Sequence, residues 1–219
     1  MNLVLDDTIR VPLDATDDLA SFRQWTKSDD YPDRGDYAYL NGDLWVDLSM
    51  ETLLHNQIKM QIAAVLSLMV VDPARLGRFF ADRMRLVTVE VGLSCEPDAM
   101  FASRESIQSG RVTWEEGAQS LEVIGVPDMV LEVVSTHSVQ KDTVVLRDLY
   151  AAAGISEYWL VNPLAGQLSF DILRLTAKGY APTRKAAGWS KSTVFGKSFR
   201  LVEEKAGDDE LPEYRLLVR

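Results

Sequence analysis

Residues 127–135 read PDMVLEVVS and residues 155–161 read ISEYWLV, with a segment of helical character between them. The first stretch carries apolar residues on both faces of an extended chain, which is typical of an interior strand that helices cover on both sides. Residues 143–153 predict a helix that stops at Gly154. Strand, helix and strand at this spacing predict a right-handed βαβ unit in a mixed or parallel sheet.

The sequence on either side of this unit predicts further strands and one long helix. PDAMFAS (97–103) predicts another strand, and Asn41-Gly42 between two alternating runs predicts a two-residue hairpin. Residues 52–71 have helical periodicity and predict an amphipathic helix that ends before Pro73. The last fifty residues predict an antiparallel meander. We therefore expect an α/β fold, with a mixed central sheet flanked by helices and an antiparallel C-terminal extension.

Composition favours one globular domain. The chain has 219 residues, of which 47% are hydrophobic, so residues 1–219 are expected to form a single domain around one sizeable core. The start of the chain, MNLVLDDTIRVPLD, is acidic and has no signal-peptide pattern. The longest apolar run, 62–71, is about half of a bilayer span. A single cysteine, Cys95, excludes an intrachain disulfide. We expect a cytoplasmic protein without a membrane anchor.

The net charge of -10 argues against a broad basic face for nucleic acid. It still allows a local basic groove on an acidic body.

Glu132 stands in the least expected surroundings, since it interrupts an otherwise apolar strand. A carboxylate buried there needs a metal, a cation or a proton. A structural ion pair or a solvent-facing strand edge would also explain it. Asp98 opens the PDAMFAS strand, and pairing of the two strands would bring Asp98 near Glu132. Two converging carboxylates suit Mg²⁺ or Mn²⁺, and a site of this kind supports phosphodiester hydrolysis with a nearby lysine.

At this point the residues resemble a known family. An acid after Pro97, an acid on the next strand and a lysine close by resemble the PD-(D/E)XK nuclease pattern. The run 127–163 resembles the Uma-type restriction endonuclease-like family within that superfamily. The resemblance extends to YLNGDLWVDLSME (39–51), EPDAMF (96–101), GYAPTRK (179–185) and GWSKSTVFGKSFRL (188–201).

The resemblance implies roles for particular residues. Asp98, Glu132 and the backbone carbonyl of Val133 would hold Mg²⁺ or Mn²⁺. The pattern places its lysine at position 134, which is valine here, and many relatives carry a helical lysine where this chain has Leu146. Lys141 is the nearest replacement and would assist the attacking water.

Four further residues are candidates for supporting roles. Glu51 matches a third acid that the superfamily often adds. His55 would touch a phosphate or the metal-bound water, or else cap its helix. Asp128 would line the site or only cap its strand, and Arg147 would substitute for Lys141.

The resemblance implies a Mg²⁺-dependent DNA endonuclease, and relatives in this superfamily often form homodimers. Two alternatives stay open. One is an inactive binding or scaffold protein that keeps the nuclease fold. The other is a metal-dependent phosphodiesterase that acts on RNA or small substrates.

Overall fold

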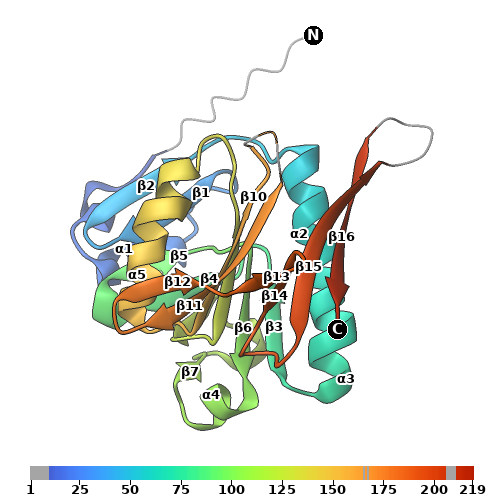
Figure 1. Cartoon of the computed structure of the whole chain (residues 1–219). Helices are drawn as coiled ribbons and strands as arrows, with labels where there is room; N and C mark the ends of the chain where they lie inside the picture. Colours follow the sequence, from blue (N-terminus) through green and yellow to red (C-terminus); the bar gives the residue numbers. More distant parts are fainter. Residues whose placement is uncertain (1–9, 165, 167, 206–210) are drawn as a thin grey trace.

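The computed structural model describes residues 10–164, 166, 168–205 and 211–219 (Figure 1). Residues 1–9, which make up most of the segment expected to lack a signal peptide, lie outside this range. The helical segments are η1 (Leu13–Thr16), α1 (Leu19–Thr26), α2 (Leu53–Val65), η2 (Leu66–Val71), α3 (Asp72–Ala74), η3 (Val89–Val91), α4 (Arg104–Gln108), η4 (Gly117–Gln119), η5 (Lys141–Val145) and α5 (Leu146–Ala153).

The strands are β1 (Asp36–Leu40), β2 (Asp43–Asp47), β3 (Gly77–Ala81), β4 (Arg85–Thr88), β5 (Leu93–Cys95), β6 (Ala99–Ser103), β7 (Val112–Thr113), β8 (Glu122–Gly125), β9 (Met129–Val133), β10 (Glu157–Asn162), β11 (Ser169–Thr176), β12 (Gly179–Pro182), β13 (Lys185–Ala186), β14 (Trp189–Lys191), β15 (Ser198–Lys205) and β16 (Pro212–Val218). Within the described residues they form three sheets, with strand orders β2-β1-β5-β4-β8-β7, β12-β11-β10-β9-β6-β3 and β13-β14-β15-β16.

The second of these sheets contains the predicted strand–helix–strand unit. β9 and β10 run parallel with Leu131 opposite Trp159, and η5 and α5 connect them. Gly154 ends α5 with a φ of 85°, as the sequence predicted. β9 also pairs with the antiparallel strand β6, so the sheet is mixed. The α/β class with a mixed sheet and an antiparallel C-terminal extension is confirmed.

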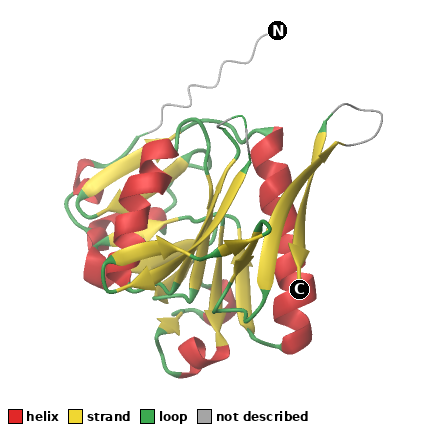
Figure 2. Ribbon diagram, in the orientation of Figure 1, coloured by secondary structure: helices red, strands yellow, loops and turns green. Residues whose placement is uncertain are grey.

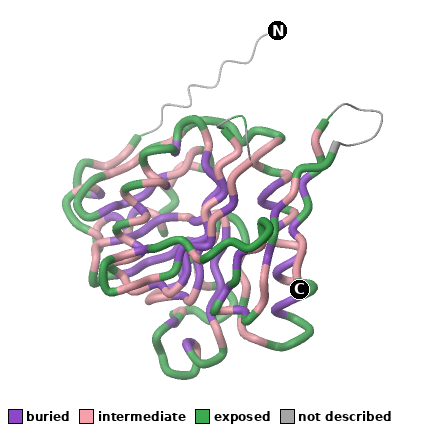
Figure 3. Tube along the Cα trace, in the orientation of Figure 1, coloured by how far each residue is buried: buried purple, intermediate pink, exposed green. Residues whose placement is uncertain are grey.

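Helices cover β9 on both faces (Figure 2). Met129, Leu131 and Val133 share one core cluster with the apolar side of α2. Val130 belongs to a second cluster with the α5 residue Tyr150. Figure 3 shows that the buried stretches concentrate in these central strands. The double-sided apolar pattern therefore predicted the place of β9 correctly.

The long helix extends further than the sequence predicted. It continues through η2, a π-helical stretch, and includes Pro73 within α3 instead of stopping before it. A proline ring clashes with the carbonyl group of a preceding turn in a regular α-helix, and the wider π turn relieves that clash. By length and composition alone, the 22 residues Leu53–Ala74 could cross a membrane. A core helix of a globular protein passes the same test, and Ile58 and Ile62 on its inner face are buried.

The predicted hairpin and meander are both present. Asn41 (φ 52°) and Gly42 (φ 101°) connect β1 to β2, and these positive φ values suit a tight hairpin turn. β11 and β12 extend the second sheet, whereas β13 to β16 form an antiparallel sheet that lies against α2 (Figure 1).

Candidate active site

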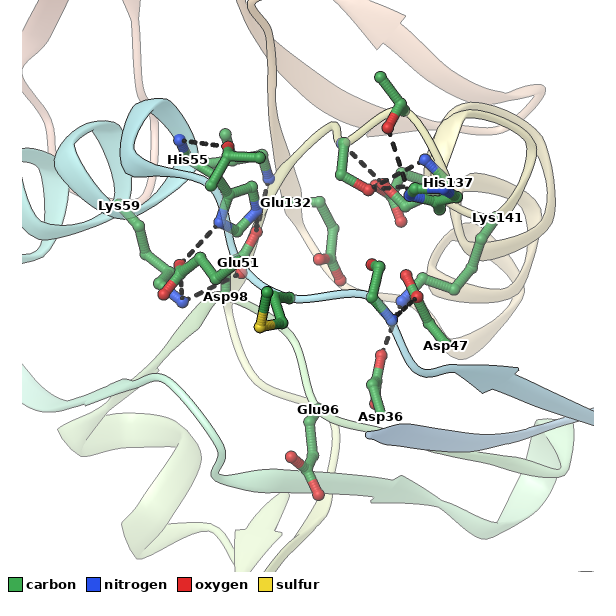
Figure 4. A pocket seen from close by; sticks show the side chains of 18 of the residues that line it. Asp36, Asp47, Glu51, His55, Lys59, Glu96, Asp98, Glu132, His137 and Lys141 are labelled. Atoms are coloured by element: carbon green, nitrogen blue, oxygen red, sulfur yellow. Dashed lines mark hydrogen bonds and ion pairs between the residues drawn. The ribbon is translucent and has the colours of Figure 1, made fainter. Parts of the chain in front are cut away.

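A cleft with a volume of about 350 Å³ opens where β9 ends and β6 begins (Figure 4). It also borders the start of α2 and the loop that leads from β9 into η5. The lining includes most of the residues that the sequence singled out: Glu51, His55, Asp98, Glu132, Val133 and Lys141.

Asp98 and Glu132 come together through strand pairing. β6 and β9 are antiparallel with Ala99 opposite Leu131, so Asp98 lies opposite Glu132 at the edge of the cleft. Asp98 Oδ2 accepts a hydrogen bond of 2.7 Å from the backbone N–H of Val133. The two carboxylates are thus neighbours, as the paired-strand argument predicted.

Glu132 is 4% exposed and lies at the base of the cleft. The hydroxyl group of Tyr150 donates a 2.7 Å hydrogen bond to Glu132 Oε1. Burial raises the pKa of Glu132 well above its usual range, and the negative charges of Asp142 and Asp98 raise it further. Burial without a cation therefore disfavours the charged form of this carboxyl group.

Lys141 lies on the other wall of the cleft, where its Nζ is 2.9 Å from Asp36 Oδ2. Burial disfavours its charge, but Asp36 and Glu132 favour the charge more strongly, so the net effect is a pKa above the usual value. The Lys141 ammonium therefore stays protonated at neutral pH. It can donate hydrogen bonds and neutralise negative charge, but it cannot accept a proton.

Asp142 is a cleft residue that the sequence reasoning missed. It is 1% exposed, and Ser138 donates a hydrogen bond to its Oδ2. Its Oδ1 is buried without a hydrogen-bond partner. Burial raises the pKa of Asp142 to about 7. No periodic signal distinguished this acid from a solvated helix residue, because the burial comes from the packing of η5 against β9.

His55, at the start of α2, lies between two carboxylates. Its Nδ1 lies 2.8 Å from Glu51 Oε1 and its Nε2 lies 3.3 Å from Asp98 Oδ2. Burial lowers the pKa of His55, but these two carboxylates outweigh that effect and raise it to about 9. His55 is consequently a cation at neutral pH, held between Glu51 and Asp98.

Lys59, one turn further along α2, was also missed. It is only 9% exposed, and its Nζ lies 2.6 Å from Glu51 Oε1, 2.9 Å from Asp82 Oδ1 and 3.9 Å from Asp98 Oδ1. A signal was present, since Lys59 is the charged residue on the buried side of a helix whose other buried positions are apolar. Figure 4 shows Lys59 and Lys141 on opposite sides of Glu132.

Two of the supporting candidates lie outside the cleft. Asp128 accepts hydrogen bonds from the backbone N–H of Ser103 (2.7 Å) and from Ser106 Oγ (2.9 Å), so it holds Ser103, the N-cap residue of α4, in place. Four residues along an extended strand span about 13 Å, which places Asp128 at the opposite end of β9 from Glu132. Arg147 donates to the carbonyl oxygen of Tyr180 (3.1 Å) and anchors β12. Neither residue lines the cleft, which leaves a structural role at the strand end for Asp128 and corrects the expectation that Arg147 substitutes for Lys141.

The two positions where the family resemblance implied a lysine are both buried in apolar surroundings. Val134 and Leu146 are each 1% exposed within apolar packing. A cation in this cleft must therefore come from other elements, and Lys59 and Lys141 are the lysines that line it among the described residues.

The donor set fits a hard cation with few protein ligands. Nowhere in the described ranges do three His, Cys, Asp or Glu side chains form a group arranged to hold a metal ion. Glu132 is nevertheless a buried carboxylate with a single hydrogen-bond donor, beside the carboxylate of Asp98. Mg²⁺ typically takes one or two carboxylates and completes its shell with water and substrate phosphate, so these two acids suffice.

Comparison with known proteins identifies the family. The family model Uma2, described as "Putative restriction endonuclease", matches residues 19–200. The chain belongs to the Uma2 family. The matched region includes every residue of the cleft named above, so the Uma2 domain contains the whole candidate site.

A solved structure supports the Uma2 fold. It is a crystal structure from Anabaena variabilis ATCC 29413, described as "a putative nuclease belonging to DUF820". It is 18% identical in sequence, has a TM-score of 0.62, and the alignment covers 82% of this chain and 90% of that chain. At this identity the likeness shows the fold. No curated protein matches the sequence.

Proposed function

We propose that this Uma2 protein is a Mg²⁺- or Mn²⁺-dependent endonuclease that hydrolyses phosphodiester bonds of DNA. The observation that carries the proposal is the pairing of β6 with β9, which brings Asp98 and the buried Glu132 to one cleft. Membership of a family described as restriction endonucleases supports the same activity.

Asp98, Glu132 and the backbone carbonyl of Val133 are the proposed cation ligands. When bound, the cation would polarise the phosphate and lower the pKa of water. Asp98 is oriented for this role by the Val133 N–H and by His55. The raised pKa of Glu132 means that cation binding must displace a proton, so cation affinity should rise with pH.

Lys141 is proposed to stabilise negative charge on the reacting phosphate. Its raised pKa favours the protonated ammonium, and that form suits this role. Lys59 and His55 add two cations beside Asp98, on the side of the cleft opposite Lys141. The cleft nevertheless stays acidic, because eight Asp and Glu side chains among the described residues line it and the positively charged residues are His55, Lys59, Arg83 and Lys141.

The test combines calorimetry with cleavage. Wild-type protein should bind Mn²⁺ and cut single-stranded or duplex DNA in Mg²⁺ or Mn²⁺, and Glu132→Gln and Asp98→Asn should lose both properties while staying folded. Asp128→Asn is the matched control, because it changes an acid at the far end of β9. Cleavage that survives in both Glu132→Gln and Asp98→Asn would refute the assigned site.

Two other outcomes would point to the alternatives. Hydrolysis of RNA or dinucleotides without DNA cleavage would indicate a phosphodiesterase for small or RNA substrates. Folded protein that cleaves nothing with any divalent cation would indicate a scaffold, which the apolar Val134 and Leu146 would explain. We further propose a homodimer, which sedimentation velocity can test.

A further inference from the structure

A second cavity, with a volume of about 270 Å³, adjoins the cleft. Asp36, Asp47 and Lys141 line both spaces, so they form a shared wall. His137 and Ser138 also belong to this shared wall, and the remaining lining residues are Ala38, Trp45 and Val46 of the β1–β2 hairpin. Figure 4 shows Asp36, Asp47 and Lys141 together on one side of Glu132.

The side cavity is lined by an aromatic side chain, Trp45, and by two carboxylates that can accept hydrogen bonds. Trp45 is half-buried and packs on the second core cluster, so its position is set by the fold. Asp36 and Asp47 present carboxylates, which accept hydrogen bonds and donate none when ionised. A planar ligand that stacks on an indole and offers N–H groups at its edge fits this combination.

We propose that the side cavity binds one unpaired nucleobase of the substrate strand, adjacent to the phosphodiester in the cleft. This inference rests on the proposed function, because that function places the phosphodiester beside Glu132. The base must leave any helical stack to enter, so the substrate is single-stranded or locally unpaired nucleic acid. Lys141, on the shared wall, lies between the base and the reacting phosphate.

The carboxylates also determine which bases fit. Adenine, cytosine and guanine carry an exocyclic amino group that can donate to Asp36 or Asp47. Thymine has no amino group, and its single edge donor, N3–H, lies between two carbonyl oxygens that repel a carboxylate. The side cavity therefore favours amino-bearing bases over thymine.

The net charge of -10 is consistent with this substrate class. A long duplex needs many phosphate contacts from a broad basic surface, and single-strand binding can rely more on base stacking.

The first experiment measures binding without cleavage. Calorimetry with dAMP, dCMP, dGMP and dTMP should give an affinity for the amino-bearing nucleotides at least about tenfold above that for dTMP. Trp45→Ala should weaken their binding by about tenfold, since stacking on an aromatic ring contributes about 1–3 kcal/mol per base. Trp114→Ala is the matched control, because Trp114 is half-buried on the same core cluster but lines a different cavity.

A second variant protects the test against misfolding of Trp45→Ala. Asp47 is partly exposed and lines the side cavity, so Asp47→Asn should keep the cavity shape, and it should reduce the preference for dAMP over dTMP because an amide can also donate to a carbonyl oxygen. Equal affinity for dTMP and dAMP would overturn the proposal. An affinity for dAMP as high in Trp45→Ala as in Trp114→Ala, together with an unchanged preference for dAMP in Asp47→Asn, would also overturn it.

The second experiment compares cleavage of oligonucleotides that carry each base at one unpaired position. The rate should fall when thymine is placed there, and Trp45→Ala should abolish the difference. Cleavage with no base preference and no nucleotide binding would refute the base site and leave the nuclease proposal intact. Nucleotide binding without cleavage of any substrate would refute the nuclease proposal and leave the base site.

Discussion

Glu132 and Glu157 lie on the neighbouring parallel strands β9 and β10, and both are almost completely buried. Glu157 accepts five hydrogen bonds, which come from Trp159 Nε1, Ser192 Oγ, Val194 N, and the backbone and hydroxyl groups of Thr193. Glu132 accepts one, from Tyr150. The same residue type in the same sheet thus has two very different environments.

The number of hydrogen-bond donors around each carboxylate distinguishes a structural acid from a candidate cation ligand. The donors around Glu157 are fixed by the fold and stabilise its charge, so this carboxylate anchors the 192–194 loop to β10. Glu132 has too few donors for its charge and faces a cleft with Asp98. A cation or substrate would complete the environment of Glu132, since buried polar groups with too few hydrogen-bond partners concentrate at functional sites.

The largest expected effect is on catalysis. Glu132→Gln keeps the shape of the side chain and removes its charge, so DNA cleavage should fall by about 100- to 1000-fold. The unfolding free energy at pH 8 should not fall. Single-turnover cleavage and urea denaturation measure the two quantities. If Glu132→Gln destabilised the fold without affecting cleavage, Glu132 would be an anchor like Glu157.

The second test replaces Glu157 and Glu132, one at a time, with leucine. Glu157→Leu should lower the unfolding free energy by about 3–5 kcal/mol, because several buried donors lose their acceptor. Glu132→Leu should be close to neutral in the cation-free protein, since one hydroxyl group loses a partner. Equal costs in urea denaturation would show that the two environments are not energetically different.

The third test uses pH. The pKa values of Glu132 and Asp142 are raised in the folded protein, to about 7 for Asp142, so the folded state binds these protons more tightly than the unfolded chain. Their stabilising effect is present below the ordinary carboxyl pKa values of 4.5 and 3.8, and it is lost as the pH rises through the folded values. His55, with a pKa raised to about 9, acts in the same direction above pH 6.5.

The cation-free protein should therefore lose about 1–3 kcal/mol of stability between pH 5 and about pH 9. Glu132→Gln should reduce this loss, and added Mn²⁺ should oppose it in the wild type. Thermal unfolding across the pH range in EDTA measures the slope. A slope that Glu132→Gln leaves unchanged would contradict the assignment of the proton to the Glu132 environment.

The smallest effect is expected outside the cleft. Asp128→Asn weakens the hydrogen bonds that Asp128 accepts from Ser103 and Ser106 and should cost about 1 kcal/mol of stability, with cleavage within about twofold of wild type. Loss of cleavage in this variant would show that Asp128 contributes to the active site. It would contradict the distinction between the two ends of β9.

The sequence by itself determined the α/β class, the strand–helix–strand unit and the meeting of Asp98 with Glu132. Alternating apolar residues and turn signals are local properties, and they specify strand faces and neighbouring pairs directly. The family resemblance followed from the same segments.

Tertiary structure alone decided which polar residues share the cleft. Asp142 and Lys59 belong to it because η5 and α2 pack against opposite faces of β9, and Asp128 is excluded because it lies at the other end of that strand. The contrast between Glu132 and Glu157 has the same origin. Donors for Glu157 arrive from residues 192–194, more than thirty positions away, and no local pattern records such contacts.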